Sequence, residues 1–412
     1  MSISLALYAV NFLSADVRNL FGPFINVFLV TNRHWTQTDV GLVSTAGGLL
    51  GIALQTPIGA AIDVTRAKRG VIVATMAAMS VAAAIIVIRP TFWPMVVATS
   101  LLAIAGDAFV PAVAALTLGL VSKEALARRL GRNSAFDHGG NILTALVAGG
   151  VGYLFSQRQV FLLVPFYAAL TSAAVLTIPA GAINQDRARD LGRSGDGDGA
   201  AAGYSALLRK RPLMIFAACA FLFHFANAPL LPLVGQKLAL QFPKEATAMM
   251  SFCMVAAQGV MVPIALLVGW RADRWGRRPI FLVAFSVLPI RAALYPVSDK
   301  AFWLLGVQLL DGVGAGIYQA LTPLVIADIM RGTGRYNLAQ GAVATTQGVG
   351  AAISSLFVGE VVDHFGYSTA FFALAAAAAV AWAAFALLMP ETRDNGSRDA
   401  VVARPAALRP SG

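Results

Sequence analysis

Charged side chains are scarce in this sequence. Lys, Arg, Asp and Glu make up 12% of its 412 residues, whereas soluble domains carry roughly 25%. Hydrophobic residues make up 58%, and the mean hydropathy is +0.72. They gather into runs of about 20 residues, the length that a helix needs to cross the hydrocarbon core of a bilayer. This composition excludes an ordinary soluble domain and predicts a multi-pass integral protein of the plasma (inner) membrane, surrounded by lipid bilayer.

Residues that carry enzyme chemistry are also few. The two cysteines, Cys219 and Cys253, lie within apolar runs and lack metal-ligand spacing. The sequence has no His/Glu metal motif, no nucleophile turn around a serine, and no phosphate-binding glycine loop with a lysine. We therefore expect no enzyme activity, no catalytic residue, no metal and no cofactor.

The basic residues do not indicate a nucleic-acid partner either. The net charge is +11, but the basic residues punctuate the apolar runs and cover no continuous face. We expect a monomer without nucleic acid.

Twelve apolar segments are long enough to be membrane-spanning helices. A membrane β-barrel is disfavoured because the runs lack its ten-residue alternation. The segments predict an all-α membrane protein of 12 transmembrane helices in two pseudo-repeated six-helix bundles, 1–183 and 212–391. The charged, Gly-rich stretch 184–211 is predicted to be a linker, and 392–412 a disordered tail. The predicted spans are 5–30, 40–62, 70–88, 93–121, 135–156, 160–183, 212–236, 246–270, 279–297, 301–330, 338–361 and 366–390.

The basic residues predict the orientation of these spans. Of the 31 Lys and Arg residues, 23 fall on the side that carries the termini and the linker, and six fall in the opposite loops. The other two, Arg18 and Arg291, lie inside spans. Cytoplasmic loops carry the excess of Lys and Arg, so both termini, the linker and the tail are predicted to be cytoplasmic.

A loop motif occurs twice, which indicates two related halves. The stretch from Gly269 to Arg278 follows the order Gly-x-x-x-Asp-Arg-x-Gly-Arg-Arg, and a looser copy from Gly59 to Arg69 begins 210 residues earlier. Other residues pair at nearly the same offset: Pro23 with Pro232, Pro179 with Pro390, and Gly150 with Gly359.

The second copy of this motif resembles the signature loop of the major facilitator superfamily. It matches the family pattern at every fixed position, whereas the first copy has Val64 in place of a basic residue and no second glycine. Pro390-Glu391-Thr392 resembles the closing tag of the same family, and the resemblance extends over 5–393. A basic loop that only sets topology would explain the arginines but not the order of the other residues.

The resemblance implies a secondary transporter. Two six-helix bundles would rock around a central cavity lined by spans 1, 4, 7 and 10. The two motif copies would form the gate and would stabilise one facing state through charge contacts without binding substrate. The implied gate residues are Gly59, Asp63, Arg66, Gly269, Asp273, Arg274, Gly276, Arg277 and Arg278.

Ionisable residues in the middle of spans are the candidates for substrate binding or proton coupling, because a charge within the bilayer is costly. They fall in the same four spans that the resemblance assigns to the cavity, together with an asparagine one helical turn from the histidine. The candidates are Asp16, Arg18, Asp107, His224, Asn227 and Asp311.

Each candidate has a structural alternative. Asp107 stands among Ala, Gly and Phe, where it could exchange a proton or form a structural hydrogen bond. Arg18 could pair with a carboxylate on another span, with Asp107 as one option. His224 titrates near neutral pH when unperturbed but could be a packing residue, and the glycine-rich helix around Asp311 could serve close packing instead.

The most probable function is a secondary active transporter of a small solute that uses alternating access and proton coupling. The alternatives are an uncoupled facilitator of the same fold and a sensor that does not transport. Leu102 stands where proton-coupled drug exporters commonly carry Arg, and span 5 lacks their Gly-Pro, so the direction stays open. The excess of acids slightly favours a cationic or neutral solute, although one buried ion pair would remove that bias.

Overall fold

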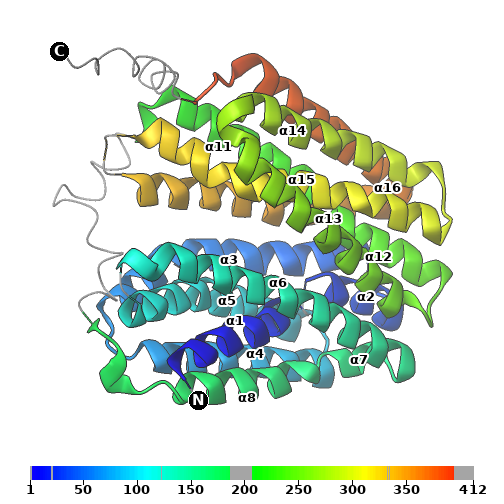
Figure 1. Cartoon of the computed structure of the whole chain (residues 1–412). Helices are drawn as coiled ribbons and strands as arrows, with labels where there is room; N and C mark the ends of the chain where they lie inside the picture. The colour runs from blue at the N-terminus through cyan, green and yellow to red at the C-terminus, as the bar shows by residue number, and fades with distance from the viewer. Residues whose placement is uncertain are drawn as a thin grey trace, which may run out of the picture.

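The computed structural model describes residues 2–19, 22–121, 123–185, 207–331, 333 and 335–393. At 16, 18, 19, 23, 60, 63, 64, 123–128, 130, 131, 134 and 337 it describes the backbone alone. Most of the predicted linker and of the predicted tail therefore lies outside the described residues. All regular secondary structure in the described part of the chain is helical (Figure 1).

The first half of the chain, up to residue 185, forms eight α-helices and one short 3-10 helix. The helices are α1 (Ile3–Asn19), α2 (Gly22–Arg33), α3 (Gln37–Val64), α4 (Lys68–Ile88), α5 (Phe92–Leu120), α6 (Lys123–Leu154), α7 (Gln157–Val160), α8 (Leu163–Leu176) and η1 (Ala180–Ala182).

The second half, described from residue 207, repeats this arrangement with helices of similar length. They are α11 (Arg211–Asn227), α12 (Leu230–Gln241), α13 (Ala246–Trp275), α14 (Arg277–Leu294), η2 (Tyr295–Val297), α15 (Ala301–Met330) and α16 (Tyr336–Leu388). The break between α11 and α12 follows from Pro229 and Pro232, because proline has no N–H to continue the helical hydrogen bonds.

Nine helical segments of the described residues are long and apolar enough to cross a membrane, compared with twelve predicted spans. One difference arises in α16, whose 53 residues would extend about 80 Å as a straight helix. Gly366, with φ 81° and ψ 169°, breaks it next to the predicted boundary between 361 and 366. Another arises because residues 20 and 21, between α1 and α2, lie outside the described residues, and the third because α6 contains a polar first part, starting at Lys123.

Each half has its own hydrophobic core. One core consists of residues between Leu207 and Met389; the other consists of first-half residues with Met250 as the single addition from the second half. In Figure 1 the first half, coloured blue to green, lies below the second half, coloured green to red. In a bilayer, such cores stabilise the helix bundles mainly through close van der Waals packing, because lipid tails are as apolar as the side chains they replace.

Equivalent helices pack through equivalent glycines in the two halves. A Cβ on Gly140 would lie 2.2 Å from the Phe12 carbonyl oxygen, and one on Gly350 would lie 2.4 Å from that of Phe221. The two glycines are 210 residues apart and the two phenylalanines 209, which matches the 210-residue spacing of the motif copies to within one residue. The repeat inferred from the sequence therefore extends to the packing of α1 on α6 and of α11 on α16.

The halves meet mainly through three helix pairs: α3 with α16, α6 with α13, and α2 with α12. We call the side where α1 begins and α16 ends the termini side, and the side where α2 ends and α3 begins the far side (Figure 1). The close approaches cluster toward the far side. For example, a Cβ on Gly152 would lie 2.3 Å from Thr247 Cγ2, and one on Gly359 would lie 2.4 Å from the Gln37 carbonyl oxygen.

Candidate functional site: a cavity between the halves

A cavity of about 660 Å³ lies between the two halves. Its volume falls within the range of about 300–1,000 Å³ that is typical of small-molecule sites. The first half contributes α2, α3 and α5, and the second half contributes α11, α12, α14, α15 and α16. The lining residues are Gly22, Ile25, Asn26, Ser44, Gly48, Ile52, Thr99, Leu102, Ala103, Asp107, Asn227, Ala228, Leu231, Pro232, Arg291, Asp311, Gly348, Ala351, Ala352 and Ser355.

Asp107 is the ionisable residue of the first-half wall among the described side chains. It lies on the face of α5 that also presents Ala103 to the cavity. A Cβ on Gly51 of α3 would lie 2.7 Å from Ala103 Cβ and 3.1 Å from Asp107 Oδ2. Gly51 therefore allows α3 to approach α5 closely and leaves room for the carboxylate.

The second-half wall carries an ion pair between α14 and α15. Arg291 Nη1 donates to Asp311 Oδ1, and the side chains are 3% and 20% exposed. Arg291 Nη2 also donates to Asn227 Oδ1 at 2.6 Å. The pair neutralises the charge of this wall, so Asp311 no longer counts toward the excess of acids that favoured a cationic solute.

A second layer of hydrogen bonds holds Asp311 in place. Gln308 Nε2 donates to Asp311 Oδ2 at 3.0 Å, and the Tyr295 hydroxyl donates to Gln308 Oε1. Both Tyr295 and Gln308 are fully buried. Both carboxylate oxygens of Asp311 are thus engaged, whereas those of Asp107 accept no hydrogen bond from the described residues.

Sequence reasoning placed Arg291 inside a span but did not include it among the site candidates. It lies in the ninth predicted span, which the family resemblance does not assign to the cavity. A buried arginine in an apolar helix was itself a usable signal, because such a charge needs a partner. Its partner, 20 residues later in the chain, is fixed only by the packing of α14 against α15.

His224 and Asn227 have different surroundings although they lie on nearby turns of α11. Asn227 lines the cavity and accepts from Arg291. His224 Nδ1 lies 3.1 Å from the Ala220 carbonyl oxygen, and its ring meets that of Tyr318 edge to face at 5.0 Å. His224 is not among the cavity-lining residues. This geometry favours the packing alternative for His224.

Three predicted site residues cannot be placed relative to the cavity. The side chains of Asp16, Arg18 and Asp63 lie outside the described residues. The pairing of Arg18 with Asp107 stays a hypothesis.

On the far side, Asp363 of α16 joins the two halves. Its Oδ1 accepts the backbone N–H of Gln37 at 3.0 Å, and its Oδ2 accepts that of Thr38 at 2.7 Å. A carboxylate at a helix N-terminus satisfies free N–H groups and interacts favourably with the helix dipole. Nearby, Gln37 Nε2 donates to the Tyr367 hydroxyl at 2.9 Å. Deeper along α3, Thr45 Oγ1 donates to the Ala352 carbonyl oxygen at 2.6 Å. These bonds hold the halves together between the cavity and the far side.

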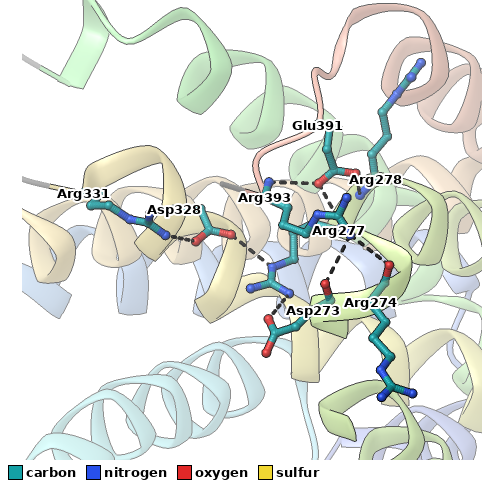
Figure 2. A network of polar contacts seen from close by, with 8 residues as sticks. All are labelled: Asp273, Arg274, Arg277, Arg278, Asp328, Arg331, Glu391 and Arg393. Carbon is teal, nitrogen blue, oxygen red and sulfur yellow. Dashed lines mark hydrogen bonds and ion pairs between the residues drawn. The ribbon is translucent and has the colours of Figure 1, made fainter. Parts of the chain in front are cut away.

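On the termini side, the second motif copy forms a polar network around Arg277 (Figure 2). Arg277 Nη1 donates to Asp273 Oδ1 at 2.8 Å and its Nε donates to Asp328 Oδ2 at 3.0 Å. The Arg277 side chain is 9% exposed and that of Asp273 is 85% exposed. Asp273 therefore pairs with an arginine of its own motif copy.

A second carboxylate of this network, that of Glu391, caps a helix N-terminus. Its Oε1 accepts from Arg277 N at 2.9 Å and its Oε2 accepts from Arg278 N at 3.1 Å, so it caps α14 (Figure 2). Burial opposes ionisation of Glu391, but backbone N–H donors from Arg393, Arg277, Arg278 and Thr392 outweigh it and hold its pKa below the usual value. The tag after the last helix is thus part of the motif network.

Arg278 and Arg393 extend this network to helix C-termini, where cations are favourable. Arg278 Nη2 donates to the Ala386 carbonyl oxygen. Arg393 Nη1 donates to the carbonyl oxygens of Asp273 and Arg274 at 3.2 and 2.8 Å. The Arg274 side chain itself is exposed.

The first motif copy makes the corresponding contact in its own half. Arg69 Nη1 donates to the Ile178 carbonyl oxygen. This bond corresponds to the one from Arg278 to Ala386 in the second half, because the arginines are 209 residues apart and the acceptors 208. Lys68 is buried and donates to the Ile62 carbonyl oxygen at the end of α3. Arg66 is exposed, and Gly59 has no atom within 4 Å of where a Cβ would lie.

The glycines of the second motif copy differ in their roles. Gly276 has φ 91°, a conformation that side chains rarely adopt, and a Cβ there would lie 2.6 Å from Glu391 Oε2. Gly269 is an ordinary helical residue with nothing within 4 Å of a Cβ. Gly269 therefore does not mediate a close approach to another helix among the described residues.

Comparison with known proteins gives a consistent result. The family model described as Major Facilitator Superfamily matches residues 7–290 and 246–410. Two Mycobacterium tuberculosis proteins, each named an uncharacterized MFS-type transporter, are 44% identical over 397 residues, which cover 96% of this chain and 95% of each relative.

Two solved structures illustrate the likeness of fold. The nucleoside transporter NupG has a TM-score of 0.78 at 14% identity, covering 94% of this chain and 99% of its own. A D-xylose-proton symporter has a TM-score of 0.73 at 12% identity, covering 95% and 98%. At this level of identity the likeness concerns the fold alone.

Proposed function

Since this chain belongs to the major facilitator superfamily, a family of membrane transporters and not of enzymes, we propose that it is a secondary active transporter of a small solute. Transport would proceed by alternating access of two six-helix bundles with twelve spans in all, divided as 1–183 and 212–391. The observation that carries this proposal is the cavity lined by both halves, with the direct contacts between the halves gathered on one side of it.

The contacts between α3 and α16 support a state that is closed on the far side. We take the termini side as cytoplasmic because 23 of 31 basic residues belong to it. The described state is then the inward-facing one. Opening of the far side would break the bonds that Asp363 makes to α3. The network around Arg277 lies on the termini side within the second half. It would hold the loop between α13 and α14 in place while the far side opens.

We further propose that transport is coupled to protons through Asp107. Its carboxylate lines the cavity and has no hydrogen bond to a described side chain, so binding and release of a proton there would break no contact with the described residues. Asp311 is less suited, because Arg291 and Gln308 hold both of its oxygens. Asp16 stays a candidate for the same role from its position in the first span.

The test is uptake into proteoliposomes of a solute identified by thermal-shift screening of a metabolite and drug library. A pH gradient is expected to drive accumulation by the wild type and to lose this effect in Asp107→Asn. Glu360→Gln, an acid-to-amide change at an exposed position near the middle of α16 on the far side, is the matched control. Full gradient-driven uptake by both Asp107→Asn and Asp16→Asn would refute the coupling role.

The alternatives predict different results in the same assay. An uncoupled facilitator would equilibrate the solute without responding to the pH gradient. A sensor that does not transport would bind the solute and show no uptake by any variant.

A further inference from the structure

The ionisable side chains that the structure describes in the cavity lining leave one negative charge without a counter-ion among them. Among the described lining residues only Asp107, Arg291 and Asp311 are charged. Arg291 and Asp311 neutralise each other, which leaves Asp107. A monovalent cation would restore neutrality, whereas an anion would meet the Asp107 charge and an arginine that already has a counter-ion.

Side-chain oxygens that accept no hydrogen bond from described residues lie on the first-half wall; on the second-half wall Arg291 Nε lacks a partner among the described residues, but it is a donor and offers nothing to a cation. Asp107, Asn26 and Ser44 line the cavity from α5, α2 and α3, and no side-chain hydrogen bond joins them to described residues. On the opposite wall, Asn227, Arg291 and Asp311 bond to one another. A polar head group would therefore bind to the first-half wall.

The described lining contains no aromatic side chain. Quaternary ammonium groups are recognised mainly by aromatic faces, and bases also stack on aromatic side chains. Without such faces, a cation is best bound through N–H groups that donate charge-assisted hydrogen bonds to a carboxylate. Primary and secondary ammonium groups satisfy this requirement and quaternary ones do not.

The remaining lining is mostly aliphatic and small. Ile25 and Ile52 belong to the first half and Leu231 and Pro232 to the second, with Leu102 beside Asp107 on α5. Together with the volume of about 660 Å³, this lining suits a compact apolar body larger than an amino acid side chain.

We propose that the solute is a monocationic primary or secondary amine with a compact apolar body, bound through its ammonium group to Asp107. The proposal rests on the transporter function proposed above and specifies its substrate class. Asn26 and Ser44 lie on the same wall and provide further acceptors for ammonium N–H groups.

Four probes with one apolar body and different head groups test this. They are 1-adamantylamine, its N,N,N-trimethyl ammonium derivative, neutral 1-adamantanol and the anion 1-adamantanecarboxylate. Binding to the full chain in nanodiscs is measured by calorimetry, with empty nanodiscs subtracted. We expect the amine to bind at least about tenfold more tightly than the other three, as a charge-assisted hydrogen bond predicts.

Variants of the cavity wall test the assigned residue. Asp107→Asn should raise the Kd of the amine about tenfold or more and leave that of 1-adamantanol unchanged. Asp107→Glu retains the charge and should retain preference for the amine over the alcohol. Glu360→Gln is expected to bind all four probes like the wild type, and circular dichroism and thermal unfolding verify that each variant is folded.

Two results would overturn the proposal. The first is binding of the carboxylate or the quaternary cation as tightly as the amine, or absence of amine binding to the wild type. The second is equal amine affinity in the wild type and folded Asp107→Asn. Uptake of 1-adamantylamine into proteoliposomes is measured separately: binding without uptake contradicts the transport function and retains the binding site, whereas uptake of another solute without amine binding contradicts only the substrate class.

Discussion

The ion pair between Arg291 and Asp311 permits a quantitative prediction for Arg291→Met. Methionine is similar in length and apolar, but it leaves Asp311 without its counter-ion. Removing one partner of a buried pair costs about 3–5 kcal/mol. Asp311 is 20% exposed and faces the cavity, so water can compensate in part. We therefore expect a loss at the lower end, about 3 kcal/mol of the free energy of unfolding.

The converse change is equally informative. Asp311→Asn leaves the Arg291 guanidinium, 3% exposed, without a counter-charge and should cost a similar amount. The double variant Arg291→Met/Asp311→Asn removes both charges, so it should recover about 2 kcal/mol relative to the sum of the single effects. Unfolding in mixed detergent micelles, followed by circular dichroism, gives the three values.

A matched control separates this pair from arginine packing in general. Arg331→Met makes the same chemical change at a side chain that is 58% exposed and also pairs with an aspartate. It should cost less than about 1 kcal/mol. Additive single and double effects at Arg291 and Asp311, or equal losses at Arg291 and Arg331, would refute the account of a buried, mutually neutralising pair.

Three further predictions concern the motif network and the helix packing. Glu391→Gln should lower the unfolding temperature at neutral pH. Because the Glu391 pKa is depressed on folding, the carboxylate stabilises the folded state above about pH 4.5, and this stabilisation is lost as pH falls through the folded pKa. A difference from the wild type that does not depend on pH would contradict the capping role. Gly276→Ala should lower the free energy of unfolding by about 1–2 kcal/mol, because the φ of 91° and the nearby Glu391 carboxylate disfavour a Cβ. Gly269→Ala, in the same motif, should leave the unfolding temperature almost unchanged. Gly140→Ala should lower the free energy of unfolding by about 1–3 kcal/mol, because its Cβ would overlap the Phe12 carbonyl oxygen. Gly150→Ala is the control, since a Cβ there meets no atom. Equal stability of the two variants would contradict the packing of α1 on α6.

The family and the helical architecture could be predicted from local sequence. The runs of apolar residues predicted the membrane-spanning helices, and the order of residues in the loop motif indicated the family. The break at Gly366 falls beside the boundary predicted from hydropathy. Hydropathy predicts the number of membrane-spanning helices less well where polar residues interrupt a helix, as in α6. The reason is that it averages over residues that face lipid and residues that face other helices.

The site was predicted in part because a charge within a membrane is informative wherever it lies. Asp107, Asn227 and Asp311 were candidates from sequence and line the cavity. What could not be predicted were the partners. Asp363 lies 325 residues from Thr38, and Glu391 lies 114 residues from Arg277. Such contacts depend on how helices from distant parts of the chain pack, which local patterns do not encode.

Alternating access is tested most directly by distances across the two sides of the cavity. Spin labels at Arg158 and Lys244 report on the far side, and labels at Ala67 and Arg331 report on the termini side; all four positions are exposed, while the native Cys219 and Cys253 are buried.

The perturbation is Gly152→Ala, whose Cβ would meet Thr247 in the other half, and Gly150→Ala on the same helix is the control, since nothing lies within 4 Å of its Cβ. In nanodiscs, Gly152→Ala should lengthen the far-side distance and shorten the termini-side distance relative to the wild type, with Gly150→Ala unchanged. Distances that stay constant on both sides, or that lengthen together, would contradict alternating access.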